Sequence, residues 1–341
     1  MRPKPSGLWE VVRTVVFLLV LALVLHVTAR VLRSKEYTAY NSAIYDEDRN
    51  SLDVLLMGSS HMLTAVSPLQ LWEEHGITSN NLAQNGQVIP VTYYQLLEAL
   101  RTQTPTLVVL DAYKVIQDSL IDAPASLHYT LDGMRPGMPK LRAAFDLLPE
   151  ERAEYLVDLI AYHDRWKELT EQDFLPLDTA SKGVEVLFST TPMADFQIFP
   201  PEVKEEPAPS AIEYLEKIVD LCRERDISLL LVAVPFATPE DDDMHRQESV
   251  NALADYAEDW GVPYINMMHL TGEFGFDYGT DMADIYHVNW RGMEKVTGWL
   301  GDYLTEHYDL PDHRGESAYA DWDQSAEDFR AYIAENVPKK A

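Results

Sequence analysis

Two hydrophobic patterns alternate along this chain from about residue 53 to residue 307. Short, nearly continuous apolar runs predict strands buried on both faces, and apolar residues recurring every three or four positions predict amphipathic helices. We expect strands at 53–57, 106–111, 227–235 and 263–267, and helices at 68–75, 91–100, 211–225, 244–260 and 289–307. Such alternation predicts parallel strands joined by crossover helices in a three-layer α/β sandwich.

The alternation is interrupted between about residues 115 and 209, where the sequence has no clear buried strand. This insertion contains one predicted amphipathic helix, Glu151–Leu169, and ends in a run rich in proline and acidic residues at 200–209. Two interpretations stay open for it: a lid or substrate wall, or a stabilising elaboration without a ligand role. Residues 309–341 form an acidic, polar tail with a short predicted helix at 325–335.

The segment Val11–Leu32 is apolar over roughly the 20 residues needed to cross a bilayer. Basic residues flank it on both sides, so they do not settle its orientation. A cleaved signal peptide is the alternative, but the apolar core is longer than a usual signal core, which favours an uncleaved anchor. We expect an anchor at 1–35, a polar connector at 36–52, and an α/β domain at 53–308 outside the cytoplasmic membrane, with the insertion inside that domain.

Charge excludes one large class of partner. The chain has 56 acidic and 27 basic residues and a formal net charge of −29. Binding to phosphate backbones depends on clustered Lys and Arg, so we expect no nucleic-acid partner. The single Cys222 cannot form an intrachain disulfide, and it falls among the apolar positions of a predicted helix, as a core residue would.

A candidate nucleophile follows the first predicted strand, where the apolar run ends abruptly in Gly58-Ser59-Ser60. In open parallel sheets, ligands bind beyond the carboxyl ends of the strands. A serine there becomes reactive only beside a base that a third group orients. Asp284 and His287 fit these roles, since they follow the last strand and one turn can bring the carboxylate beside the ring.

Together these blocks resemble the SGNH (GDSL-like) hydrolase superfamily, in particular its membrane-anchored, extracytoplasmic branch linked to acylation of cell-envelope polymers. The strand followed by Gly-Ser-Ser assigns the nucleophile to Ser60 in that family. The Asp284-x-x-His287 block continues with Asn289 and Gly292, as the family pattern often does. The resemblance therefore implies a flavodoxin-like parallel sheet and a Ser60–His287–Asp284 triad.

The oxyanion hole is less complete than the triad. The resemblance implies main-chain donors at Ser60 and Gly86, but the family's third block often carries Gly-x-Asn, and here the strand is followed by Ala112-Tyr113-Lys114. Asn85 is a candidate substitute for that side-chain amide. Loss of the Asn also keeps open a second hypothesis, a catalytically silent binding or assembly subunit of an envelope acylation system.

We expect an esterase or O-acyltransferase that acts on an acylated envelope carbohydrate or polymer. The resemblance implies that a membrane-bound O-acyltransferase could be its partner. His61 could line the site, but packing at a helix start is the favoured interpretation. Asp241-Asp242-Asp243 are best explained as acidic residues before a helix. We expect no metal and no cofactor.

Overall fold

The computed structural model describes residues 7–35, 38–116, 124–148, 150, 152–193, 196–238 and 244–338. In this part of the chain five parallel strands form a single sheet in the order β2-β1-β3-β4-β5. The strands are β1 (Val54–Met57), β2 (Ser79–Asn81), β3 (Leu107–Asp111), β4 (Ser228–Ala233) and β5 (Tyr264–Asn266). This is the flavodoxin-like strand order, so the predicted α/β class is confirmed.

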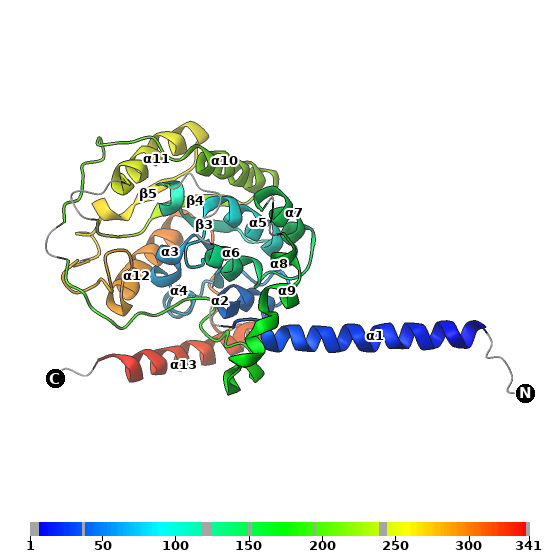
Figure 1. The fold of residues 1–341 in the computed structure, drawn as a ribbon. Coiled ribbons are helices and arrows are strands. Elements are labelled where there is room, and N and C mark those ends of the chain that lie inside the picture. Colours follow the sequence, from blue (N-terminus) through cyan, green and yellow to red (C-terminus); the bar gives the residue numbers. More distant parts are fainter. Residues whose placement is uncertain are drawn as a thin grey trace, which may run out of the picture.

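Helices cover both faces of the sheet and make the other two layers (Figure 1). Right-handed crossovers place α5 (Ile89–Ala99), α10 (Pro209–Glu224) and α11 (Arg246–Trp260) on one face. The other face carries α3 (Ser60–Ala65), α4 (Pro68–His75) and α12 (Trp290–His307). Contacts of α5 with α10, and of α12 with α3 and α4, agree with this division.

The central strands are buried throughout, as their continuous apolar sequences predict. The sequence did not reveal β2, because its three residues Ser79, Asn80 and Asn81 are all polar. Its main chain pairs with β1, and the Asn81 amide donates to the carbonyls of Met62 and Val66. Backbone pairing and amide hydrogen bonds thus replace hydrophobic burial at this edge strand.

The described part of the insertion is helical up to about residue 174 and mostly irregular from there to residue 208. Its elements are α6 (Pro124–Leu131), α7 (Met138–Leu147), α8 (Arg152–Leu156), α9 (Asp158–Tyr162) and two 3₁₀ turns, η3 (His163–Lys167) and η4 (Glu171–Phe174). The single helix predicted for Glu151–Leu169 is therefore wrong. Val157 is extended, with φ −133° and ψ 96°, and this break turns Asp158 toward Arg33, to which it is ion-paired.

Segments at the two ends of the chain extend from the same region of the body (Figure 1). Helix α1 (Gly7–Leu32) projects away from it, whereas α13 (Ala320–Asn336) packs on α4. The Trp322 side chain is buried, and Asp323 accepts a hydrogen bond from Trp72 Nε1 at 3.1 Å. The acidic tail thus contains a longer helix than 325–335, and that helix belongs to the folded body.

The remaining short elements are α2 (Thr38–Ser42), η1 (Ala43–Tyr45), η2 (Tyr113–Ile116), η5 (Met267–His269) and η6 (Ser317–Tyr319). The first two belong to the predicted connector, which packs on the body: Asn41 donates to the carbonyl of Thr130 at 2.8 Å. Cys222 is buried in α10, and burial raises the pKa of its thiol to about 12, consistent with an inert core residue.

Candidate active site

Ser60 is presented by a sharp turn between β1 and α3. Gly58 makes this turn with φ +144°, and a Cβ there would lie only 3.0 Å from the Asp111 Cβ and from the Asp111 carbonyl oxygen. Ser59 is the N-cap residue, and Ser60 is the first residue of α3. The glycine thus lets the chain turn against β3, and the turn places the Ser60 hydroxyl at the carboxyl end of the sheet.

The loop before α12 is held by Asn289. Its side-chain oxygen accepts from the N–H groups of Arg291 and Gly292 at 3.0 and 3.3 Å, which caps the helix. Its amide nitrogen donates to the carbonyl of Thr280 at 2.8 Å. Asn289 and Gly292, which belong to the block identified by sequence, therefore support the loop that carries Asp284 and His287.

Ser60, His287 and Asp284 form one chain of hydrogen bonds. Ser60 Oγ lies 2.8 Å from His287 Nε2, and His287 Nδ1 lies 2.9 Å from Asp284 Oδ2. Burial opposes ionisation of Asp284, but hydrogen bonds from the His287 ring and from the N–H groups of Tyr286 and His287 hold its pKa below the ordinary value. These contacts join three residues that are separated by up to 227 positions in the sequence.

The turn that contains Gly86 is joined to the serine turn. The N–H of Gln84 donates to the carbonyl oxygen of Gly58 at 3.3 Å. Gly86 itself has φ +66°, a left-handed conformation that suits glycine. The Asn85 amide is directed at the Glu185 carboxylate at 3.5 Å, and within the described residues no hydrogen bond joins it to Ser60 or His287.

His61 and Tyr113 pack against each other beside the triad. The ring of His61 is 3% exposed and stacks on Tyr113 with 3.5 Å between centroids. Its centroid lies 5.5 Å from that of His287. Burial, together with the nearby His287, Lys114 and Arg246 side chains, holds the pKa of His61 well below its ordinary value, so this ring is neutral.

This stack occupies the region of the block that lacks the expected Asn. No sequence pattern predicts this pair, because the two residues are 52 positions apart and neither belongs to a periodic pattern. The favoured interpretation of His61, packing at a helix start, agrees with its burial in α3.

The second half of the insertion runs along the candidate site. The N–H of Thr191 donates to the carbonyl of Met282 at 3.0 Å, and its hydroxyl donates to the carbonyl of Ala283 at 2.7 Å. The N–H of Trp290 donates to the carbonyl of Leu187 at 2.9 Å. Residues 185–193 therefore brace the Asp284–His287 loop, and both interpretations of the insertion, a wall or a stabilising elaboration, stay open.

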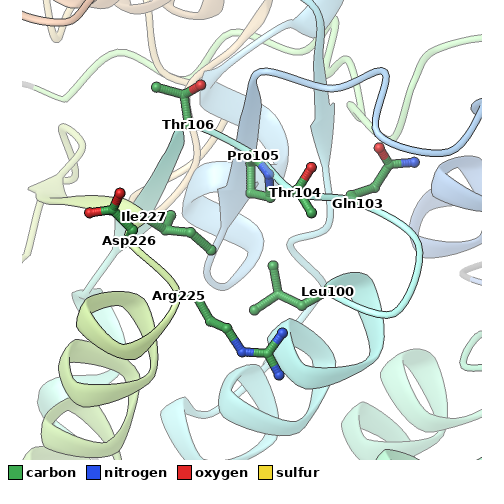
Figure 2. A pocket seen from close by; sticks show the side chains of 8 residues that line it. All are labelled: Leu100, Gln103, Thr104, Pro105, Thr106, Arg225, Asp226 and Ile227. Atoms are coloured by element: carbon green, nitrogen blue, oxygen red, sulfur yellow. The ribbon is translucent and has the colours of Figure 1, made fainter.

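A hollow lies away from the triad (Figure 2). It has a volume of about 320 Å³, and its lining includes Thr106 and Ile227, which directly precede β3 and β4. It is therefore at the amino ends of the strands, opposite the triad. Among the described residues no cluster of His, Cys, Asp or Glu is placed to hold a metal ion, and Asp241–Asp243 lie outside them.

No family model and no curated protein matches this sequence. Solved structures with a similar arrangement include a candidate acylhydrolase from Bacteroides fragilis NCTC 9343, with 10% identity and a TM-score of 0.39 over 78% of this chain and 94% of the other. A GDSL-like lipase from Bacteroides thetaiotaomicron VPI-5482 has 11% identity and a TM-score of 0.40 over 80% of this chain and 99% of its own. Both names fall in the class that the sequence blocks resemble. At such identities and TM-scores, the activity of this chain has to be argued from its own site.

Proposed function

We propose that this chain is a serine hydrolase or O-acyltransferase that works through an acyl-Ser60 intermediate. The observation that carries the proposal is the continuous hydrogen-bond chain from Ser60 Oγ through His287 to Asp284, with distances of 2.8 and 2.9 Å. A nucleophile, a base and a group that orients the base are the three parts that serine catalysis needs.

In the first half of the reaction, Ser60 Oγ attacks the carbonyl carbon of an ester and its proton passes to His287 Nε2. Asp284 stabilises the resulting imidazolium and keeps Nε2 directed at the serine. The tetrahedral intermediate collapses, the ester C–O bond breaks, and His287 returns the proton to the leaving alkoxide. In the second half, water or an acceptor hydroxyl attacks the acyl carbon and gives its proton to His287 Nε2. The bond from the acyl carbon to Ser60 Oγ then breaks, His287 returns the proton to Oγ, and the free acid or the acylated acceptor leaves.

The negative oxygen of the intermediate needs donors. The N–H of Ser60 lies in the first turn of α3, where a helix leaves its N–H groups without acceptors in the helix. The Gly86 turn, tied to Gly58 through Gln84, is the second candidate donor. Removing one such donor typically slows catalysis by about 10² to 10³-fold. The Asn85 amide is directed at Glu185, so it would have to leave that carboxylate to become a third donor to the oxyanion.

The substrate class follows from the sequence resemblance and from α1. In the described part of the chain, α1 is the helix long and apolar enough to cross a membrane. We propose that it is retained as an anchor and that the body acts outside the cytoplasmic membrane on an acylated envelope carbohydrate or polymer, with a membrane-bound O-acyltransferase as a candidate partner. Fusions of a reporter to the C-terminus test this orientation, and a cytoplasmic reporter would overturn the envelope substrate.

A fluorophosphonate probe and p-nitrophenyl acetate test the chemistry together. We expect the wild-type chain to be labelled and to release nitrophenolate, and Ser60→Ala to do neither. Ser59→Ala is the matched control, because Ser59 is the adjacent buried serine and its hydroxyl contacts His61 rather than His287. An unlabelled wild-type protein that is folded would favour the silent binding subunit instead.

Transfer and hydrolysis are separated by the products. Incubation with acylated and unacylated envelope glycans, followed by mass spectrometry, detects either free acid or a newly acylated sugar. Both activities should disappear in Ser60→Ala, since they share the acyl-enzyme.

A further inference from the structure

Exposed apolar side chains outside α1 are concentrated in one part of the body. Among the described residues beyond α1, eleven large apolar side chains are exposed, and eight of them lie between residues 138 and 175. Trp166 is 63% exposed and Phe174 66%. Scattered exposed apolar residues are ordinary, but a concentration of them usually marks an interaction surface.

Five of these residues surround the end of α1: Val157, Ile160, Trp166, Phe174 and Leu175. We call these five residues the collar. They belong to α9, η3 and η4 or directly adjoin them, and all three elements contact α1. Figure 1 shows α9 at the end of α1 where the helix meets the body, and α7, α8 and α9 on the side toward which α1 extends.

Polar contacts fix the collar to α1 at its carboxyl end. Arg33 Nε donates to Asp158 at 3.0 Å, and Arg165 donates to the carbonyl of Leu32 at 2.6 Å. Lys35 donates to the carbonyl of Asp173 at 2.6 Å. These hydrogen bonds involve the last turn of the helix and the residues just after it. The collar therefore cannot shift along the axis of α1 without breaking them.

The length of α1 then determines the depth of the collar relative to a bilayer. Its 26 residues span about 39 Å, whereas the hydrocarbon core is about 30 Å thick. The exposed large apolar side chains of α1 run from Leu8 to Val27, with Glu10 and Arg13 among them near the amino end, and the first basic residue after them is Arg30. The last turns of α1, and with them the collar, therefore reach the level of the lipid headgroups.

We propose that the collar is a membrane-interface surface whose occupant is the lipid bilayer around α1; the proposal rests on α1 being an uncleaved anchor, as proposed above. Trp and other large apolar side chains at this depth are typical of interfacial contacts. The first half of the insertion thus seats the body on the membrane, while its second half braces the catalytic loop.

Charge indicates which kind of lipid contact to expect. Asp158 is paired with Arg33, Asp173 with Arg165 and Asp164 with Lys167, whereas no ion pair within the described residues involves the exposed Glu168 and Glu171. The collar has no excess of basic residues that would require anionic lipid. We therefore expect the collar to contact bilayers of zwitterionic phosphatidylcholine.

Spin labels in the full-length chain, reconstituted into phosphatidylcholine vesicles, test the collar. Labels at Trp166→Cys and Phe174→Cys report it, a label at Leu19→Cys reports α1, and a label at the exposed Glu216→Cys on α10 is the aqueous control. The native Cys222 is buried, and the chain without an added cysteine gives the labelling blank. Oxygen partitions into lipid and nickel complexes stay in water, so their relative effects on each label report its depth.

We expect labels at 19, 166 and 174 to be oxygen-accessible, with 166 and 174 shallower than 19, and the label at 216 to be nickel-accessible. If 19 is in lipid while 166 and 174 contact water, the collar proposal fails and the anchor stands. If 19 is also in water, both fail, whereas the Ser60 labelling experiment is unaffected. Dipolar coupling between labels at 166 would show a second copy of the chain on this surface and overturn the bilayer as its occupant.

Discussion

The two ends of the parallel sheet differ in what their polar groups do. At the carboxyl end, Ser60 meets Asp284 and His287, which share a loop far along the chain, in one hydrogen-bond chain. At the amino end, the hollow in Figure 2 is lined by a polar side chain that serves the fold: Gln103 accepts from Ser51 N–H at 3.1 Å and donates to the Asp48 carbonyl at 2.8 Å.

The difference teaches that concavity is a weak sign of a site when its polar groups are already used by the backbone. A catalytic site needs groups that converge on one point and keep the capacity to exchange a proton. The carboxyl end meets this requirement, whereas the Gln103 amide in the hollow at the amino end is already bonded to the main chain. Substitutions matched between the two ends therefore test the comparison directly.

The largest expected effect is on ester hydrolysis by Ser60→Ala. Removing the nucleophile should lower kcat/KM for p-nitrophenyl acetate by about 10⁴-fold or more, because attack by water then has only the binding site to assist it. Thr104→Ala removes a hydroxyl from the rim of the opposite hollow and should change kcat/KM by less than about twofold. If Thr104→Ala lost most of its kcat/KM while Ser60→Ala stayed active, the active site would lie at the amino end of the sheet and not at the carboxyl end.

Asp284→Asn should lower kcat by about 10⁴-fold with little change in KM. The amide can neither stabilise the imidazolium nor hold the His287 tautomer that accepts the serine proton. Asp226→Asn, at the exposed start of the opposite hollow, should leave kcat unchanged. Equal activity of Asp284→Asn and the wild type would mean that His287 does not need its partner.

The sequence predicted the part of the site that is carried by short blocks. Ser60, Asp284 and His287 were identified because a glycine turn and an Asp-x-x-His spacing are local patterns, and the parallel sheet was identified from continuous apolar runs. The stack of His61 on Tyr113 and the pairing of Asp158 with Arg33 depend on tertiary contacts that no local pattern encodes. β2 was missed for a related reason, since polar residues form that strand through main-chain pairing.

Gly58→Ala should lower the free energy of unfolding by about 2 to 3 kcal/mol, through left-handed strain together with contact against Asp111. Gly261→Ala, in the turn before β5, is the matched substitution: its φ is +62°, but no atom lies within 4 Å of the added Cβ. We expect only the strain there, about 1 kcal/mol. Thermal unfolding of both full-length variants in one detergent compares them, and equal losses would show that the close packing of the serine turn against β3 is unimportant.

The last prediction concerns the buried Asp111 at the end of β3, where the effect depends on pH. Burial raises the pKa of the Asp111 carboxyl to about 7. Hydrogen bonds from the N–H groups of Val234 and Tyr113 lower the pKa, but burial has the larger effect. Because the folded state holds this proton more tightly than the unfolded state, the stabilising contribution is complete below the unfolded pKa of about 3.9 and is lost as the pH rises to about 7.

Asp111→Asn removes that pH dependence. As the pH rises from about 5 to 7, the free energy of unfolding of the variant should therefore increase relative to that of the wild type by about 1.4 kcal/mol per pH unit, and the difference should then level off. Chemical denaturation at several pH values measures the trend. Asp226→Asn is again the control from the amino end, because this residue is exposed. A flat difference for Asp111→Asn would mean that water reaches the carboxyl end of β3 and that the two ends of the sheet are equally solvated.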